Sequence, residues 1–255
     1  MSNVKALAAT LTEQHESGQV LILPTVWDTW SADVAAEAGF QALTVGSHPV
    51  ADALGSADGE HMDFVHYLEV IKRITETVDV PVSADVESGY GLEPAELIQR
   101  LLEAGAVGAN IEDVVHSENS RVRDRAEHAD YIAAARQVAD EAEISFVING
   151  RTDAIKLGTE VFPDPLAEAA ERVALMEEAG ARAVYPVGVS SAAEITRLVQ
   201  AVSVPVNLTA HPVEGHAAGD VATLKELGAR RITFGPLWQK WLGEVSAQQL
   251  STWIP

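Results

Sequence analysis

The sequence contains no cysteine among its 255 residues. The absence of thiols excludes disulfides, thiolate metal ligands and a cysteine that acts as nucleophile or general acid. Basic residues are also scarce, since 17 Lys and Arg stand against 38 Asp and Glu and the formal net charge is −21. A chain this acidic is repelled by phosphate backbones and anionic lipids, so we expect neither nucleic acid nor a membrane as partner.

Long apolar runs are missing as well. The longest, 20–26, is interrupted by Pro24 and Thr25 and is far too short to cross a bilayer. Residues 1–10 lack a basic segment followed by a long apolar one, so we expect no signal peptide and a cytoplasmic protein. The 47% of apolar residues suffices for one substantial core, which predicts a single domain over 1–255.

A repeated unit organises the chain. Four segments carry a glycine that closes a helical pattern just before a short β-rich run, and they are 37–39, 103–106, 178–181 and 226–229. Apolar runs predict eight buried parallel strands at about 20–23, 42–45, 82–85, 107–111, 145–149, 183–186, 205–208 and 231–234. Amphipathic segments between them, for instance 64–78, 94–104, 130–142 and 165–179, predict helices.

This alternation of strands and helices predicts an α/β fold. Eight strands favour a single (β/α)8 TIM-type barrel over an open, doubly wound sheet. The segment 4–17 is expected to form an extra N-terminal helix that covers the bottom of the barrel. In such barrels, function lies where the strands end and the following loops begin.

Acidic residues stand at two neighbouring strand ends. Asp85 and Glu87 follow the third strand, two residues apart, so an extended backbone would point them the same way. Glu112 ends the fourth strand. Such carboxylates repel each other unless a cation lies between them, and hard oxygen ligands suit Mg²⁺ or Mn²⁺. We predict that these three residues bind the metal; the alternative is that they are solvated loop acids or helix N-caps.

Two further strand ends predict substrate contacts. Arg151 follows the fifth strand, and its planar guanidinium can clamp a carboxylate or phosphonate, unless it only pairs with Asp153. Gly46, Ser47 and His48 follow the second strand, where small residues expose backbone N–H groups that can hold a substrate oxyanion.

Other polar and aromatic residues allow two interpretations each. Tyr185 and Asn207, at the sixth and seventh strands, bind substrate or only hydrogen-bond to their neighbours. His211 carries a proton or is simply an exposed loop histidine. Trp27 and Trp30, after the first strand, more often fill core or interface space than contact a substrate.

The segment 85–91, Asp-Val-Glu-Ser-Gly-Tyr-Gly, resembles the Asp-x-Asp-Thr-Gly-Tyr-Gly signature of the isocitrate lyase/phosphoenolpyruvate mutase superfamily. Four further features match in order across most of the chain: 27–32, Leu54-Gly55 with Asp58, 111–113 and 151–153. The resemblance implies a Mg²⁺-dependent barrel enzyme. Its members make or break a C–C or P–C bond next to a 2-oxo acid, through an enolpyruvate-type intermediate.

The resemblance also implies roles for individual residues. The three carboxylates named above would hold the metal directly or through water, and Asp58 would lie near the reacting group. Arg151 would bind the acidic group of the substrate, and 46–48 would supply oxyanion donors. Metal and backbone amides would then stabilise negative charge on the 2-oxo oxygen as the neighbouring bond breaks.

The loop 114–121 departs from the lyase branches of the superfamily. Those branches carry Lys-Arg-Cys-Gly-His there, with the Cys as acid/base, whereas this loop reads Val-Val-His-Ser-Glu-Asn-Ser-Arg. Cleavage of isocitrate or methylisocitrate by the usual chemistry is therefore disfavoured. Asn119-Ser120 resembles the loop of phosphoenolpyruvate mutase and phosphonopyruvate hydrolase, although their nearby lysine is missing. His116 and Asn119 become candidate catalytic residues, and His48, His116, Tyr185, His211 and a metal-bound water all stay open as proton carriers.

Three functions are compatible with these residues. The first is a Mg²⁺-dependent lyase or mutase acting on a small 2-oxo acid, with decarboxylation of an oxaloacetate-type substrate, retro-aldol cleavage and P–C chemistry as candidate reactions. A phosphate-binding isomerase or an aldolase is disfavoured, because 233–236 offers one glycine and a proline without an N–H, and no predicted strand end carries a lysine. The third is a non-catalytic barrel that binds 2-oxo acids.

The last part of the sequence bears on assembly. Many relatives exchange a C-terminal helix between subunits and form tetramers. Residues 238–253 are expected to be too short for a full exchanged helix pair. A homo-oligomer, dimer or tetramer, is expected all the same.

Overall fold

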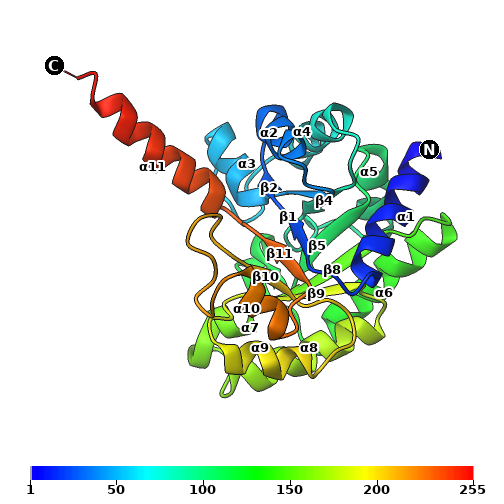
Figure 1. Cartoon of the computed structure of the whole chain (residues 1–255). Helices are drawn as coiled ribbons and strands as arrows, with labels where there is room; N and C mark the ends of the chain where they lie inside the picture. The colour runs from blue at the N-terminus through cyan, green and yellow to red at the C-terminus, as the bar shows by residue number, and fades with distance from the viewer. Residues whose placement is uncertain (1, 255) are drawn as a thin grey trace.

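Nine short parallel strand segments form a closed ring in the computed structural model, which describes residues 2–254 (Figure 1). They are β1 (Leu21–Leu23), β2 (Thr25–Val26), β3 (Leu43–Val45), β4 (Val82–Asp85), β5 (Gly108–Glu112), β8 (Val147–Thr152), β9 (Ala183–Pro186), β10 (Asn207–Thr209) and β11 (Arg231–Thr233). The order β2-β3-β4-β5-β8-β9 forms one sheet and β1-β11-β10 another. A parallel bridge between Val184 and Val206 joins them, and β1 runs into β2 through Pro24.

These segments occupy eight positions in the ring, because β1 and β2 are two parts of one strand. Proline has no N–H to give to a ladder, which explains the break at Pro24. The predicted α/β barrel is confirmed. The largest shift in strand bounds is at β8, which runs to Thr152 and therefore includes Arg151, whereas the sequence pattern placed the strand at 145–149.

Helices alternate with the strands around the ring. They are α1 (Ser2–Glu16), α2 (Thr29–Glu37), α3 (Ser47–Leu54), α4 (Phe64–Thr77), α5 (Pro94–Glu103), α6 (Arg125–Glu141), α7 (Ala154–Leu157), α8 (Pro165–Glu178), α9 (Ala192–Val199), α10 (Val221–Glu226) and α11 (Leu237–Ser251). The glycines that end the repeated unit, 39, 105, 180 and 228, all have φ between 84° and 95°, as the pattern predicted. Helix α6 begins five residues before the predicted start, because the Asp124 side chain accepts the Glu127 N–H.

Helix α1 covers the amino-terminal end of the barrel, as expected. Its Leu11 is fully buried, and the Thr12 hydroxyl donates to the Ser145 carbonyl at 2.8 Å. His15 reaches into the barrel, where its Nε2 lies 2.8 Å from a guanidinium nitrogen of the buried Arg231. Burial and the Arg231 charge lower the pKa of His15 to about 3, so the ring is a neutral acceptor for this arginine.

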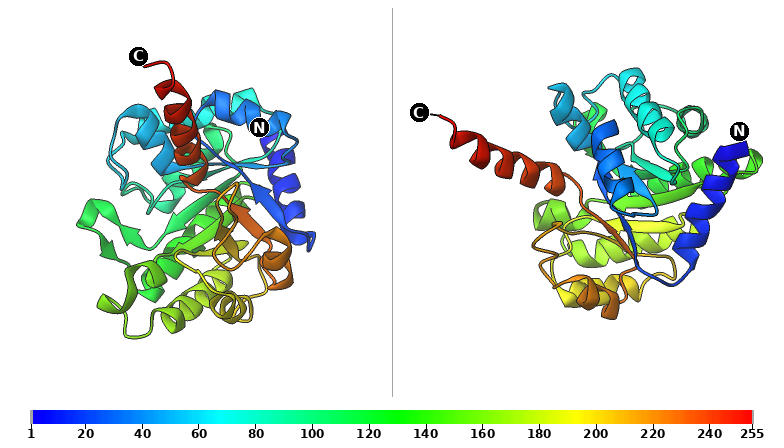
Figure 2. Two further views of the ribbon diagram at one scale, coloured as in Figure 1. Left: turned by 60° about the vertical axis from the view of Figure 1, so that its left-hand side comes forward. Right: turned by 45° about the horizontal axis from the view of Figure 1, so that its top comes forward.

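Helix α11 differs from the other long helices. It projects away from the barrel in Figure 1 and in the right-hand view of Figure 2, and it has no buried residue. Only its base is anchored, where the Trp238 ring meets Trp27 edge-on at 5.1 Å and the Gln239 amide donates to the Pro49 carbonyl. No helix within residues 2–254 is long and apolar enough to cross a membrane.

Candidate active site

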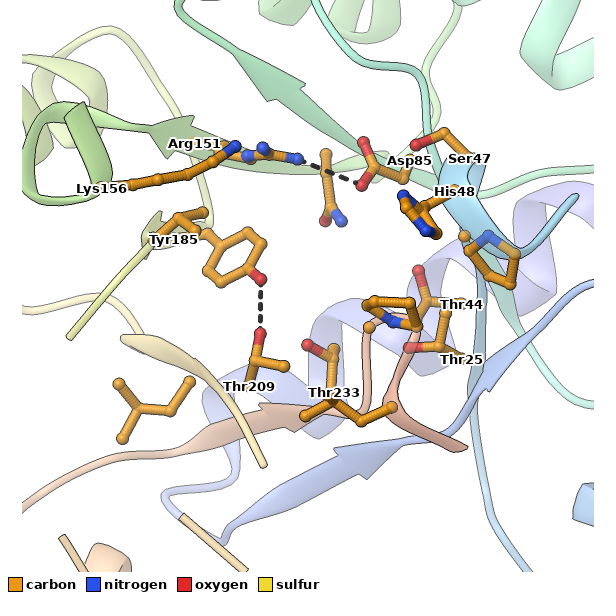
Figure 3. A pocket seen from close by; sticks show the side chains of 18 of the residues that line it. Thr25, Thr44, Ser47, His48, Asp85, Arg151, Lys156, Tyr185, Thr209 and Thr233 are labelled. Atoms are coloured by element: carbon orange, nitrogen blue, oxygen red, sulfur yellow. Dashed lines mark hydrogen bonds and ion pairs between the residues drawn. The ribbon is translucent and has the colours of Figure 1, made fainter. Parts of the chain in front are cut away.

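A cavity of about 340 Å³ lies at the carboxyl ends of the strands (Figure 3). Its polar lining comes from almost every strand end: Thr25, Thr44, Ser47, His48, Asp58, Asp85, Asn110, Arg151, Lys156, Tyr185, Thr209 and Thr233. Arg151, Lys156 and Tyr185 lie on one side, across from Ser47 and His48. A concave site with a few convergent polar groups at this end of a barrel is where a small ligand binds.

Arg151 is the centre of the charged cluster. Its Nη1 lies 2.6 Å from Glu112 and 3.4 Å from Asp85, and its Nε donates to Asp153 at 2.8 Å. Burial raises the pKa of both Asp85 and Glu112, while the guanidinium between them opposes the rise. The Arg151–Asp153 ion pair, which was the alternative to substrate binding, is therefore present, and Arg151 also contacts both acidic strand ends.

Glu87 does not join Asp85 and Glu112. Its carboxylate accepts the Tyr90 hydroxyl at 2.7 Å and the Glu60 N–H at 2.6 Å, and burial raises its pKa to about 8. The expectation that Asp85 and Glu87 point the same way was wrong. Strand β4 ends at Asp85 and Glu87 has a φ of 51°, so the alternation of an extended backbone no longer applies.

The carboxylates at these strand ends differ in how well they suit a divalent cation. Within residues 2–254 no three Asp, Glu or His side chains form a group with metal-binding geometry. Asp85 and Glu112 nevertheless supply hard oxygen atoms from adjacent strands, where the Arg151 guanidinium lies 2.6 Å from Glu112 Oε2. Those two residues fit a hard cation, whereas Glu87 does not in this conformation.

The turn after β3 presents free backbone donors. Gly46 precedes α3 as its N-cap and makes no side-chain cap, so the N–H groups of Ser47 and His48 have no partner among the described residues. Both residues line the cavity. A Cβ at Gly46 would lie 2.5 Å from the Thr25 side chain, so only glycine allows this close packing. The predicted oxyanion donors are thus placed at the cavity.

Two more predicted residues, Asp58 and Tyr185, line the cavity. His48 Nδ1 lies 3.0 Å from an Asp58 oxygen, so the carboxylate orients the ring at the rim. Tyr185 shares a short hydrogen bond with the Thr209 hydroxyl, and its ring lies 5.7 Å from the Arg151 guanidinium carbon. Burial raises the pKa of this tyrosine, so it stays a phenol.

Besides Glu87 and Glu112, four predicted residues do not line it. Asn207 is buried among Arg231 and Thr233 inside the barrel, and His211 accepts backbone N–H groups of its own loop. Asn119 is exposed in a left-handed turn after the 3-10 helix η1 (His116–Glu118). His116 reaches the site only through Glu112, 2.7 Å away, and this hydrogen bond raises the pKa of His116.

Sequence reasoning missed Lys156 and Glu60. Lys156 lies on α7, four residues beyond β8, so a search restricted to strand ends passed over it. Glu60 accepts the Tyr90 N–H at 2.8 Å and the Ser117 N–H at 3.0 Å, which ties the loop before α4 to the loop after β5. No sequence spacing relates Glu60 to the two loops that it joins, since its contacts span 30 and 57 residues.

A buried histidine supports the strand that carries Arg151. His128 on α6 is 1% exposed, and its Nε2 lies 3.1 Å from the Arg151 carbonyl. Burial, with Arg123 and Arg172 nearby, lowers its pKa to about 3. The unfolded chain therefore takes up a proton here between pH 6.5 and 3 while the folded chain does not.

We expect this histidine to make the protein less stable in acid. The contribution of neutral His128 to the free energy of unfolding is complete above pH 6.5. It falls as the pH is lowered and is smaller by about 2 kcal/mol at pH 5. Urea unfolding at pH 7.5 and pH 5 measures this change. Between the two pH values, the free energy of unfolding should fall by about 2 kcal/mol less in His128→Gln than in the wild type. The exposed His66→Gln is the control and should keep the wild-type difference; an unchanged difference in His128→Gln would contradict the assignment.

The sequence model of the family described as phosphoenolpyruvate phosphomutase matches residues 11–251. The chain belongs to this family. Its curated relatives include 2-methylisocitrate lyase of Escherichia coli (strain K12), which is 31% identical over 79% of this chain and 68% of the relative. An oxaloacetate decarboxylase of Rhodopseudomonas palustris (strain TIE-1) is 28% identical over 88% of this chain and 76% of its own length.

One solved structure has the same fold as this protein over nearly the full chain. It comes from Burkholderia cenocepacia J2315 and is provisionally assigned as a phosphonomutase. The identity is 38%, the TM-score is 0.87, and the match covers 96% of this chain and 99% of that one. The family resemblance and the barrel expected from the sequence are confirmed, and the relatives are lyases and mutases.

Proposed function

We propose that this protein is a divalent-metal-dependent lyase or mutase that makes or breaks a C–C or P–C bond next to a 2-oxo acid. One observation supports it above all: free N–H donors at Ser47 and His48 lie across one cavity from Arg151, with Asp85 between the two walls. Hydrogen-bond donors on two sides of the cavity suit a 2-oxo acid, because one set can bind its carboxylate while the other stabilises the enolate that forms at its 2-oxo group.

The residues would divide the work as follows. The N–H groups of Ser47 and His48 would donate hydrogen bonds to the 2-oxo oxygen as it gains negative charge, since they are fixed before the reaction and need no reorganisation. Arg151 would bind the substrate carboxylate with its planar donors. His48, oriented by Asp58, would move a proton at the rim.

The metal belongs to this proposal too. Asp85 and Glu112 would hold Mg²⁺ or Mn²⁺, which when bound supplies Lewis-acid stabilisation of the 2-oxo oxygen. Glu87 would share its hydrogen bonds with Tyr90 and Glu60 instead of acting as a direct ligand.

Decarboxylation of an oxaloacetate-type substrate is the second candidate. The Rhodopseudomonas palustris relative bears that name and covers 88% of this chain. The reaction leaves an enolate of the same kind, so the same donors would serve it.

A turnover screen tests both candidates and a third, non-catalytic role. The purified chain would be incubated with Mg²⁺ or Mn²⁺ and oxaloacetate, phosphonopyruvate or branched 2-hydroxy diacids, and the products identified. Metal-dependent release of pyruvate, or conversion of phosphonopyruvate to phosphoenolpyruvate by transfer of the phosphoryl group from C3 to the enol oxygen, supports the proposal. Binding of these compounds without turnover of any would favour the non-catalytic barrel, and neither binding nor turnover would contradict both.

We also propose that the protein assembles as a cytoplasmic homo-oligomer through α11. Leu250, Trp253 and Ile254 are 68%, 87% and 76% exposed at the far end of this helix, where a second copy would cover them. Light scattering should give a multiple of 27.1 kDa. Leu250→Asp with Trp253→Asp should shift the mass to that of one chain, while Gln248→Asp on the same helix should not. A wild-type mass of one chain would contradict the proposal.

A further inference from the structure

Lys156 is placed beside Arg151 by a short, well-defined turn. Strand β8 ends at Thr152, Asp153 starts α7, and Lys156 follows three residues later on the same helical face. Its Nζ donates to Asp153 Oδ2 at 2.7 Å. Figure 3 shows its side chain running alongside Arg151 on one wall of the cavity.

Arg151 and Lys156 differ in how many of their hydrogen-bond donors remain free for a ligand. Arg151 is buried and faces three carboxylates, those of Asp85, Glu112 and Asp153. The side chain of Lys156 is 53% exposed and has one acidic partner, so two of its three ammonium protons stay available. Lys156 is also the only lysine among the described residues that line the cavity.

The charge of the cluster calls for a second cation. A divalent cation on Asp85 and Glu112 would, with the Arg151 guanidinium, only balance the three carboxylates, which leaves no net positive charge for a doubly anionic ligand. Burial alone would raise the pKa of Asp153, but Arg151 and Lys156 hold it at about 2, so this carboxylate stays charged. The free ammonium protons of Lys156 are therefore the donors best placed for an additional anion.

The backbone of Lys156 is held in place by the next loop. Gly188, after β9, has a φ of 96°, and a Cβ there would lie 3.0 Å from the Lys156 nitrogen and 3.2 Å from its Cα. This close approach packs the segment 187–189 against α7, and both line the cavity. The stem of Lys156 therefore starts from a fixed point, while its end is free to adjust.

We infer that Lys156 binds the second anionic group of the substrate, a carboxylate or phosphonate beyond the 2-oxo acid core, and so selects doubly charged substrates. The inference rests on the proposed function, because it assigns a further contact to the same cavity. The lysine at the cavity thus comes from α7, whereas the loop 114–121 contains no lysine.

Binding measurements separate this role from a surface ion pair. Calorimetry in Mg²⁺ would compare phosphonopyruvate, which has a second anionic group, with pyruvate, which has none. Lys156→Met should weaken phosphonopyruvate binding about 10- to 100-fold and leave pyruvate binding within about 2-fold, as expected for one lost charged hydrogen bond. Lys156→Arg should recover most of the loss, and Gly188→Ala should weaken the same ligand by displacing the α7 backbone.

The control is Lys72→Met, which removes another half-exposed lysine that pairs with an acid, Glu76, far from the cavity. It should bind both ligands like the wild type. If the substrate screen shows turnover, the KM of a doubly charged substrate should rise in Lys156→Met by the same factor as the dissociation constant, with kcat changed less than about 3-fold.

Each outcome has a distinct meaning. Equal binding of phosphonopyruvate by Lys156→Met and wild type overturns the inference and leaves the proposed function intact. Equal weakening of both ligands shows that Lys156 acts through Asp153 and Arg151, which also overturns it. If the wild type binds neither ligand, the proposed function itself fails.

Discussion

Asp85→Asn is expected to reduce metal-dependent turnover of a 2-oxo acid at least about 1,000-fold, the loss of several kcal/mol of metal-derived stabilisation. Asp85 lies at the last position of β4 and faces both the cavity and the Arg151 guanidinium. The amide keeps the size of the side chain but removes its charge, and a neutral oxygen is a much weaker ligand for a hard cation.

The fold should survive this substitution. Arg151 keeps its contacts with Glu112 and Asp153, so no buried charge loses all its partners. The matched control is Asp33→Asn, which changes an exposed acid on α2 that does not line the cavity and should keep nearly full activity. Initial rates and Mg²⁺ titrations on both variants provide the measurement. Wild-type turnover by Asp85→Asn, with an unchanged metal requirement, would show that the metal is held elsewhere.

The second large effect concerns stability. We expect Asp113→Asn to lower the free energy of unfolding by about 3–5 kcal/mol, the usual cost of breaking a buried ion pair from one side. Asp113 is fully buried and accepts the Thr152 hydroxyl at 2.6 Å, the Asp153 N–H at 3.0 Å and Arg172 at 3.1 Å. An amide presents one acceptor oxygen and two donor hydrogens to these three donors, so at least one of them would lose its partner.

This network holds the cavity end of β8 against α8. The carboxylate of Asp113 fixes the turn from which Asp153 starts α7, and Arg172 also pairs with Glu168 at 2.8 Å. Urea unfolding at pH 7.5 measures the effect, with the exposed Asp79→Asn as control, for which a change within about 0.5 kcal/mol is expected. A loss below about 1 kcal/mol in Asp113→Asn would mean that the donors find other partners.

The sequence predicted the barrel because its signals are local. Each apolar run and each helix-closing glycine reflects the conformation of a few neighbouring residues, and eight repeats of the pattern leave few folds open. The predicted strand at 145–149 was too short, since polar Arg151 and Thr152 continue β8 to its end at the cavity. Apolar patterning does not mark the part of a strand that faces a polar site.

The site was predicted less completely. Strand-end reasoning placed Asp85, Ser47 and Arg151 at one cavity, where the structure has them. It failed at Glu87, where a left-handed residue replaces the assumed strand. Asn119, a candidate from the family resemblance, is kept exposed by the loop after β5. The cause at Glu87 is that the alternation of side chains holds only while the backbone stays extended.

The sequence by itself determined the barrel, the family and the end of the barrel where polar groups gather. Only the tertiary structure decided which of those groups share a contact: Arg151 with Asp85, 66 residues earlier, and Lys156 on the same wall. The reason is that periodicity and propensity act over a few residues. Distances between strand ends depend on how the ring closes, and side-chain partners are chosen by the burial and charge that closure creates.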